Sequence, residues 1–239
     1  VIHLSGESIS KQWTKKNKKE ILDSRILSTR LLKNGLEKTS NRKISNIICS
    51  SAIGVYPNSL DEVFNEKTKI IQNNFLQEIV IKWEKELQKL SSLTKNFSIL
   101  RIGLVLSVNG GILPRLALPV RLFIGAAFGS GRQWQSWIHL SDLTRMFLEF
   151  SENEWYGLFN AVSPNPVTQR NFLKVLGQSI NRPVFFPNIP SSIIKLILGE
   201  RSILVLGSQK VSCDLIIEKG FSFKYNKLDE ALENIYKKV

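Results

Sequence analysis

The chain has 239 residues, 43% of them hydrophobic and 22% charged, so it is long enough to bury a full core. Charged residues interrupt its apolar segments before the ~20 residues that a membrane-spanning helix needs, and no repeat or Pro-, Ser- or Gln-rich tract indicates a solenoid or a disordered chain. Two cysteines and two histidines, far apart in the sequence, exclude a disulfide framework and a metal site and favour a reducing compartment.

The net charge of +13 is strongly basic. Roughly half of the excess lies in residues 1–45, where eleven Lys and Arg stand against four Asp and Glu. No helix-turn-helix, zinc-finger or RRM signature follows this segment, so only its charge favours nucleic acid. We interpret its lysines as the solvated face of a helix, with attraction of an anionic cofactor or substrate as the alternative.

Strands and helices are predicted to alternate in the first half of the chain. Val1–Gly6 is a short apolar run that ends in glycine, which is typical of a buried strand that enters a turn. A long helix capped by Thr14 follows, because apolar residues recur at helical spacing. The next predicted elements are a strand at 44–51, a helix at 73–90 and a strand at 97–102.

This alternation is typical of a doubly wound α/β fold with a parallel sheet and right-handed crossovers. Open sheets of this type bind ligands beyond the carboxyl ends of their strands. Ser5, Ser51 and Arg101 each stand at the end of a predicted strand. We therefore expect these three side chains to converge on one cleft.

Shorter elements follow residue 106. Helices are expected near residues 113–124, 142–151, 168–180, 191–198 and 227–237, and extended segments near 134–140 and 158–160. We therefore assign residues 1–106 to the α/β domain and residues 107–239 to a smaller α+β lobe, and expect some elements of the lobe to return to the sheet.

The start of the chain lacks two expected features. Val1 is the first residue and Met146 the only methionine, so we expect residues upstream. The Gly-x-Gly-x-x-Gly turn that places a pyrophosphate on a helix N-terminus is also missing, since Gly110-Gly111 and the glycines of 125–131 do not have this spacing between a strand and a helix. We infer that the first strand-helix units of the fold are absent.

A set of motifs, in one order over nearly the whole chain, resembles one family. They are Ile2-His3-Leu4-Ser5-Gly6-Glu7, Trp13-Thr14, Ser24-Arg25-Ile26, Ser51-Ala52-Ile53-Gly54-Val55-Tyr56, Lys82-Trp83-Glu84, Leu100-Arg101-Ile102-Gly103-Leu104-Val105-Leu106, Gly110-Gly111, Gly129-Ser130-Gly131-Arg132-Gln133, Trp137-Ile138-His139, Phe159-Asn160-Ala161-Val162-Ser163-Pro164 and Gly207-Ser208-Gln209-Lys210-Val211. The family is the YfcH-type group of atypical short-chain dehydrogenase/reductases, whose members are labelled nucleoside-diphosphate-sugar epimerases or SulA-like cell-division inhibitors.

The resemblance implies a Rossmann-like domain that binds NADP(H) or NAD(H), a C-terminal substrate lobe similar to DUF1731, and a small-molecule substrate. Because the glycine-rich turn is missing, we expect this chain to bind the cofactor weakly. The resemblance also fits a homodimer and a cytoplasmic location, or a plastid one in a plant or alga.

Several rim residues match the family's cofactor site. Leu4-Ser5-Gly6 resembles the turn that lies against the cofactor, where glycine permits close approach of the backbone, although it could be a plain strand-ending turn. Ser24 and Arg25 could contact a phosphate or form a helix-surface ion pair. Arg101 and Gly103 resemble the segment beside the nicotinamide, with a buried ion pair as the alternative for Arg101.

The catalytic residues depart from the pattern of active relatives. Ser51 matches the serine that hydrogen-bonds the substrate, but no tyrosine begins a Tyr-x-x-x-Lys motif, in which the lysine lowers the pKa of the phenol. Alignment on Lys82-Trp83-Glu84 puts Leu76 and Val80 near the missing pair. Tyr56 could supply a phenol beside Ser51, although packing or substrate contact is the alternative.

The segment 129–139 matches the stretch that flanks the substrate in the extended members of the superfamily. It supplies the substrate candidates Arg132, Gln133, Trp137 and His139, although His139 could instead be structural. Asp142 is expected to cap the helix that follows.

Two functions remain open. The first is an NAD(P)-binding epimerase or oxidoreductase that acts on an unknown substrate, such as a nucleotide sugar, through a nonstandard site. The second is a non-catalytic NADP(H)-binding regulatory protein related to cell division. The sequence does not decide whether the chain is an enzyme.

The basic N-terminal helix is predicted not to bind nucleic acid specifically. Phosphate contacts alone give an affinity that falls steeply with salt. Fluorescence anisotropy with labelled duplex and single strands at rising salt checks this. Sub-micromolar binding that persists at physiological salt would contradict it.

Overall fold

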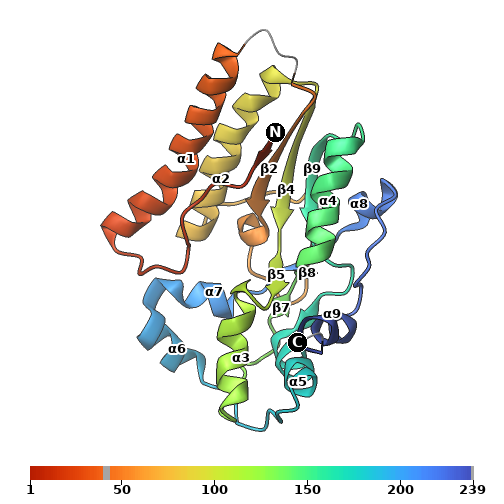
Figure 1. Ribbon diagram of the computed structural model, residues 1–239. Helices are drawn as coiled ribbons and strands as arrows, with labels where there is room; N and C mark the ends of the chain where they lie inside the picture. The colour runs from red at the N-terminus through yellow and green to blue at the C-terminus, as the bar shows by residue number, and fades with distance from the viewer. Residues whose placement is uncertain (40–43, 238–239) are drawn as a thin grey trace.

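The structure is a computed structural model that describes residues 1–39 and 44–237 (Figure 1). Its centre is a parallel sheet, as the α/β pattern predicts, with the strands in the spatial order β1-β2-β4-β9. The strands of this sheet are β1 (Ile2–His3), β2 (Asn46–Ala52), β4 (Asn96–Ile102) and β9 (Gly157–Ala161).

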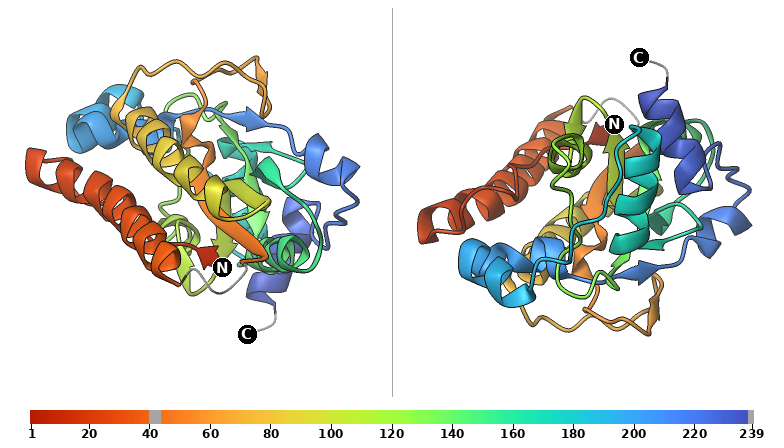
Figure 2. Two further views of the ribbon diagram at one scale, coloured as in Figure 1. Left: turned by 90° about the horizontal axis from the view of Figure 1, so that it is seen from above. Right: turned by 90° about the horizontal axis from the view of Figure 1, so that it is seen from below.

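Helices cover both faces of this sheet. α1 (Lys15–Lys38) and α2 (Phe75–Leu87) lie side by side on one face, and α4 (Leu140–Glu152) lies on the other (Figures 1 and 2). Successive residues of β2 point to opposite faces, as a strand requires. Ile47 therefore packs into the cluster under α1 and α2, whereas Ile48 packs into the cluster under α4.

The first strand differs from the prediction. A buried strand is expected over Val1–Gly6, but β1 has only two residues, and Ile2 is 46% exposed and Leu4 61% exposed. The physical reason is position: β1 is an edge strand in the described sheet, so only β2 pairs with it. The expected burial of this run is wrong.

The cap of the long helix agrees with the prediction. The Thr14 side chain accepts a hydrogen bond from the Asn17 amide at 3.2 Å and so satisfies one of the free N–H groups at the start of α1. α2 begins in the same way, since Asn74 accepts from the Gln77 amide at 3.0 Å. A polar side chain therefore sets the start of both helices.

Shorter elements complete the fold. The remaining helices are α3 (Leu113–Arg121), α5 (Gln169–Ser179), α6 (Ser191–Leu198), α7 (Ile203–Leu206), α8 (Asp214–Glu218), α9 (Leu228–Tyr236) and the 3-10 turns η1 (Ile53–Val55), η2 (Gln88–Leu93) and η3 (Gly199–Ser202). The short strands are β3 (Val63–Phe64) paired with β11 (Lys210–Val211), β7 (Trp134–Gln135) paired with β10 (Val167–Thr168), and β5 (Leu104–Ser107), which lies between β6 (Gly110–Gly111) and β8 (Trp137–His139). Across the described ranges, no helix has the length and hydropathy to cross a membrane.

The two parts of the chain are interleaved. β9 and α4 belong to residues 107–239 but complete the central sheet and its cover, while β3, from the first part, pairs with β11 near the end of the chain. A separate cluster, centred on the fully buried Trp137, joins α3, α5 and α9 in the lower part of Figure 1. The boundary at residue 106 stays a prediction.

Gly103 is expected to be essential for this packing. A Cβ at Gly103 would lie 2.5 Å from the Ser136 carbonyl oxygen and 2.7 Å from Val162 Cγ1, contacts that the backbone must move to relieve. Replacing Gly103 with Ala should lower the free energy of unfolding by about 2 kcal/mol.

Gly35→Ala is the matched control, because nothing lies within 4 Å of a Cβ at that position in α1. It should raise the free energy of unfolding by about 0.5–1 kcal/mol. Urea unfolding of both variants measures the difference, and equal stability would show that the close approach at Gly103 relaxes freely.

Candidate functional site

A buried polar network lies at the carboxyl ends of β2 and β4. Ser51 and Arg101 are directly paired in register on these strands, and both reach Glu84 of α2. The Ser51 hydroxyl donates to Glu84 Oε1 at 2.6 Å, and Arg101 donates to both carboxylate oxygens at 2.8 and 2.7 Å. Arg101 is only 5% exposed, so this bidentate pair is largely shielded from water.

Tyr56 extends the network to β9. Arg101 donates to the Tyr56 hydroxyl at 3.1 Å, and that hydroxyl donates to Asn160 Oδ1 at 2.7 Å. The backbone amide of Asn160 in turn donates to the Glu66 carboxylate at 2.7 Å. These contacts therefore link α2 to β4, to the loop that contains Tyr56 and to β9. The three segments lie far apart in the sequence.

The electrostatics of this network oppose proton transfer by Tyr56. Burial disfavours the charged form of Arg101, but the hydrogen bonds and charge of Glu84 outweigh burial and raise the pKa of Arg101. Burial also raises the pKa of Tyr56 above its ordinary value, and Arg101 and Asn160 offset only part of this rise. Tyr56 therefore stays a neutral phenol near neutral pH and acts as a hydrogen-bonding group.

The two positions of the missing Tyr and Lys are filled by apolar packing. Leu76 lies against the backbone of Gly54, since a Cβ on Gly54 would be 2.9 Å from Leu76 Cγ, and Val80 is buried in the core under α4. The next turn of α2 carries Glu84, which sequence reasoning did not select. The signal available in the sequence was that Glu84 is the acidic residue of the Lys82-Trp83-Glu84 motif. Its partner, the buried Arg101, lies on a distant strand.

The β1 rim is open, and Arg25 lies beneath it. Leu4, Ser5 and Gly6 are exposed, and a Cβ on Gly6 would lie 3.2 Å from Cζ of Arg25. The register of β1 and β2 puts Ser5 at the same edge of the sheet as Ser51.

The Arg25 guanidinium has an unusual environment. It lies over the Trp83 ring, 5.1 Å from the centroid, and donates to the Ile21 carbonyl at 2.9 Å. Burial lowers the pKa of Arg25, and the charge of Glu7 offsets part of this. Arg25 has no ion pair with any acid in residues 1–39 and 44–237, and the buried Trp83 Nε1 also lacks a hydrogen-bond partner there. The spare donors of Arg25 fit an anion, and the helix-surface ion pair considered for it is not formed.

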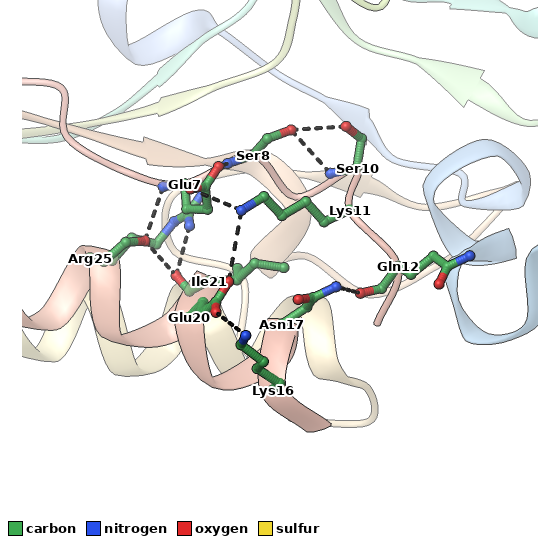
Figure 3. A network of polar contacts seen from close by, with 11 residues as sticks. Glu7, Ser8, Ser10, Lys11, Gln12, Lys16, Asn17, Glu20, Ile21 and Arg25 are labelled. Carbon is green, nitrogen blue, oxygen red and sulfur yellow. Dashed lines mark hydrogen bonds and ion pairs between the residues drawn. The ribbon is translucent and has the colours of Figure 1, made fainter. Parts of the chain in front are cut away.

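Ser24, on α1, forms a hydrogen bond with the loop that precedes this helix. Its hydroxyl accepts from the Glu7 amide at 2.9 Å and donates to the Ile21 carbonyl at 2.9 Å. Figure 3 shows the surrounding network, in which Lys11 joins Glu7 to Glu20 of α1. This network fastens the loop that follows the rim onto the helix.

Ser51 and Arg101 are thus brought together by Glu84, and Arg25 contacts Trp83, the preceding residue of α2. Adjacent residues of α2 therefore contact Arg25 on one hand and the Ser51–Arg101 pair on the other. Ser5 is exposed at the rim after β1, at the same edge of the sheet as Ser51.

A groove of about 770 Å³ opens between the starts of α1 and α2 and the η3–α7 segment. Trp13 and Phe75 meet edge to face, with their centroids 5.1 Å apart, and Lys18 lies over the Phe75 ring. Lys18 also pairs with Glu200, which closes the groove on the lobe side. The groove is lined by Trp13, Lys15, Lys18, Lys19, Leu22, Asn73, Asn74, Phe75, Glu78, Glu200 and Ile203. Sequence reasoning missed it because its walls come from three distant segments.

The substrate candidates of the segment 129–139 are mostly buried. Arg132 is exposed, whereas the Gln133 amide donates to the carbonyls of Phe128 and Val205 and to the Gln169 side chain. Trp137 is fully buried and donates to the Asn165 carbonyl at 3.0 Å. Of the four candidates, Arg132 alone is solvent-exposed, and none of the four lines the groove.

His139 has the role that Asp142 was expected to have. The His139 side chain accepts from the Ser141 amide at 3.0 Å, so it caps α4, and its ring lies 4.1 Å from the Tyr225 ring at a tilt of 38°. Asp142 lies inside the helix, where its carboxylate accepts from the amides of Lys224 and Tyr225. The expected Asp142 cap is wrong because this carboxylate instead anchors the loop before α9.

Neither cysteine is placed to act as a nucleophile. Cys49 and Cys213 are both buried, and burial raises the pKa of each thiol to about 12. A reactive cysteine needs the thiolate near neutral pH.

Comparison with known proteins places these features in context. Residues 189–235 match the model of a domain of unknown function, DUF1731. An epimerase family protein of Staphylococcus epidermidis is 37% identical over 99% of this chain and 79% of its own length. One from Staphylococcus aureus is 38% identical over 100% of this chain and 79% of its length.

Two solved structures are also similar. A human epimerase family protein crystallised with NADPH is 28% identical, with a TM-score of 0.92 over 100% of this chain and 81% of that chain. A nucleoside-diphosphate sugar epimerase of Corynebacterium glutamicum is 27% identical, with a TM-score of 0.75 over 98% of this chain and 45% of that chain.

Removal of Arg101 is expected to destabilise the protein strongly. Arg101→Met leaves the Glu84 carboxylate in a shielded place without its cationic partner, so the free energy of unfolding should fall by about 3–5 kcal/mol. Denaturant unfolding measures it.

The double variant Arg101→Met/Glu84→Leu is the control, because it removes both charges. It should recover most of the loss, since two apolar side chains replace the ion pair. A double variant as unstable as the single one would show that the pair contributes through shape alone.

Proposed function

This chain belongs to the epimerase family, and from that premise we propose that it is an NAD(P)-binding, epimerase- or oxidoreductase-type protein of the short-chain dehydrogenase/reductase superfamily acting on a small molecule. The observation that carries the proposal is the likeness over the whole chain to the human family member crystallised with NADPH. The finer assignment, to the YfcH-type group, rests on the ordered motifs.

The β1 rim and Arg25 suit a dinucleotide. Leu4, Ser5 and Gly6 present an open backbone, and Arg25 offers guanidinium donors that no carboxylate occupies in the described chain. A phosphate accepts such donors in a planar, bidentate way. When bound, NADP(H) or NAD(H) would supply hydride transfer, and these residues would hold and orient it.

The affinity of this chain for the cofactor is proposed to be low. Its 239 residues contain no Gly-x-Gly-x-x-Gly turn, so the pyrophosphate would lack the usual ring of backbone N–H donors at a helix N-terminus. Arg25 and the rim would then provide the main phosphate contacts.

Ser51 and Tyr56, the catalytic candidates of the sequence, are proposed to position the site from beneath, because they are only 3% and 1% exposed and neither lines the groove. The Ser51 hydroxyl donates to Glu84, which fixes its direction. Tyr56 is a neutral phenol whose hydrogen bonds to Arg101 and Asn160 fix the ring. Both act by positioning, and neither is set up to remove a proton.

The groove is the proposed place for the substrate. Lys15 and Lys19 line it, and the Trp13–Phe75 pair gives an apolar wall. These groups favour a small molecule with a negative charge and an apolar or planar part. A nucleotide sugar has this chemistry, and Arg132 is proposed to contact the part of the substrate that extends along the lobe.

A non-catalytic regulatory protein related to cell division is the second candidate. The apolar Leu76 and Val80 favour it, because they replace the residues that move a proton in active relatives. NADPH oxidation with carbonyl substrates that carry a phosphate or carboxylate, and interconversion of nucleotide-sugar epimers, which consumes no net NADPH, separate the two candidates: turnover in either assay supports the enzyme, and cofactor binding without turnover in both supports the regulator.

Arg25 is predicted to determine cofactor affinity. Arg25→Met should weaken NADPH binding by about tenfold, which is the loss of roughly one charge-assisted hydrogen bond. NADPH fluorescence titration measures the dissociation constant.

Arg30→Met is the matched control, because Arg30 lies on the same helix but pairs with Glu86. It should change the affinity less than twofold. The S. epidermidis relative, titrated beside this chain, should bind NADPH more tightly. Equal weakening by the two arginine variants would contradict the role of Arg25.

A further inference from the structure

The second half of the chain has two long stretches without an acidic residue. No Asp or Glu occurs between Glu86 and Asp142, or between Glu154 and Glu200. Residues 107–141 and 155–199 nevertheless contain seven Lys and Arg, and none of the seven forms an ion pair within the described ranges. On α1, by contrast, Lys16, Lys19 and Lys33 each pair with an acid one turn away. Residues 107–141 and 155–199 are therefore two parts of the lobe whose positive charge no acid offsets locally.

The same stretches expose large apolar side chains. On α6, Leu196 is 86% exposed and Ile197 70% exposed, and in the turn after α3, Leu122 is 60% exposed and Ile124 56% exposed. Phe185 is 67% exposed. Single exposed apolar residues are ordinary, but grouped ones mark an interaction site.

These groups lie at one end of the molecule. α3, α5 and α6 occupy the lower part of Figure 1, and the right view of Figure 2 looks onto this end. Arg182 lies over the Phe123 ring at 5.0 Å, and Phe128 bridges Ile189 just before α6. We call the exposed side chains of α3, residues 122–124, residues 182–186 and α6 the basic apolar surface.

The turn 122–124 is built to present apolar side chains. Phe123 has φ 62°, a left-handed conformation that is unusual for a bulky residue. The amides of Leu122, Phe123 and Ile124 donate to carbonyls of α3 at 3.1, 3.0 and 2.9 Å. Because these amides are satisfied within the chain, the turn can enter an apolar medium without losing their hydrogen bonds.

Cations surround the apolar groups and two hollows beside them. Arg115, Arg121 and Lys195 are exposed on α3 and α6. Hollows of about 430 and 330 Å³ lie between α5 and residues 181–188, with Lys174 lining both, and Arg182 and Arg170 lining one each. These hollows therefore place cationic side chains beside the apolar groups.

We propose that the basic apolar surface docks the protein on an anionic membrane surface. Projecting aliphatic and aromatic side chains enter the boundary between headgroups and acyl chains, and Lys and Arg beside them attract anionic lipids. Nucleic acid would use the cations but leave the aliphatic side chains in water. An acidic protein would need an apolar partner surface of matching shape, whereas a membrane accommodates projecting side chains of any arrangement.

Vesicle sedimentation tests the proposal with the 239-residue chain. Phosphatidylcholine vesicles with about one third phosphatidylserine, at about 0.15 M salt, should retain the protein, and pure phosphatidylcholine should not. Leu122→Ser/Phe123→Gly/Ile124→Ser should lower the partition coefficient by about tenfold or more. Glycine suits the left-handed position, so this variant should fold, and its circular dichroism and melting confirm that it does.

Matched controls separate a specific surface from general basicity. Leu27→Ser/Leu31→Ser removes similarly exposed apolar groups from α1 and should bind like the unchanged protein. Arg121→Gln/Lys195→Gln should weaken binding severalfold, and Lys16→Gln/Lys38→Gln should not. Three outcomes would overturn the proposal. They are failure of the protein to bind the anionic vesicles, an equal loss of binding in the α1 variants, and full release of the protein from the vesicles by polyglutamate or duplex DNA at equal charge.

Discussion

The buried ion pair between Glu84 and Arg101 links α2 to β2 and β4 and, through Tyr56, to β9. A charge shielded from water must be paired and hydrogen-bonded, or the fold loses several kcal/mol. Glu84 therefore fixes the rotation of α2 against β4, and Arg101 fixes the Tyr56 hydroxyl, which in turn binds Asn160 on β9. Three strands, a helix and a loop are held in register by one carboxylate.

Charge is distributed in two different ways in this protein. On α1, Lys16, Lys19 and Lys33 each pair with an acid one turn away, although residues 1–45 keep an excess of seven positive charges. The lobe has fewer cations but no acids over long stretches, so its field extends outward. The groove lies where the two regions meet, with Lys18 paired to Glu200 across it.

Periodicity and capping residues predicted the helices and the parallel strands, because both depend on neighbours in the sequence. Thr14 and the stripe of α1 are local signals of this kind. Burial of β1 was mispredicted because it depends on what lies beside the strand. Other features depend on contacts between distant segments, which no local pattern contains. They are the role of Glu84, the stacking of Arg25 on Trp83, and the roles of His139 and Asp142.

The arrangement of α2 limits the chemistry that the site can support. Leu76 and Val80 remove the proton relay, burial keeps Tyr56 neutral, and both cysteines are inert thiols. Glu84 accepts from Arg101 with both oxygens and from Ser51 with one, so its lone pairs are largely engaged. Trp83, its neighbour, supports Arg25, whose guanidinium lies 5.1 Å from the ring centroid. Adjacent residues of one helix turn therefore contact Arg25 and orient Ser51. These contacts orient Ser51 and restrain Arg25, whereas none of Leu76, Val80, Tyr56 and the two cysteines is set up to move a proton.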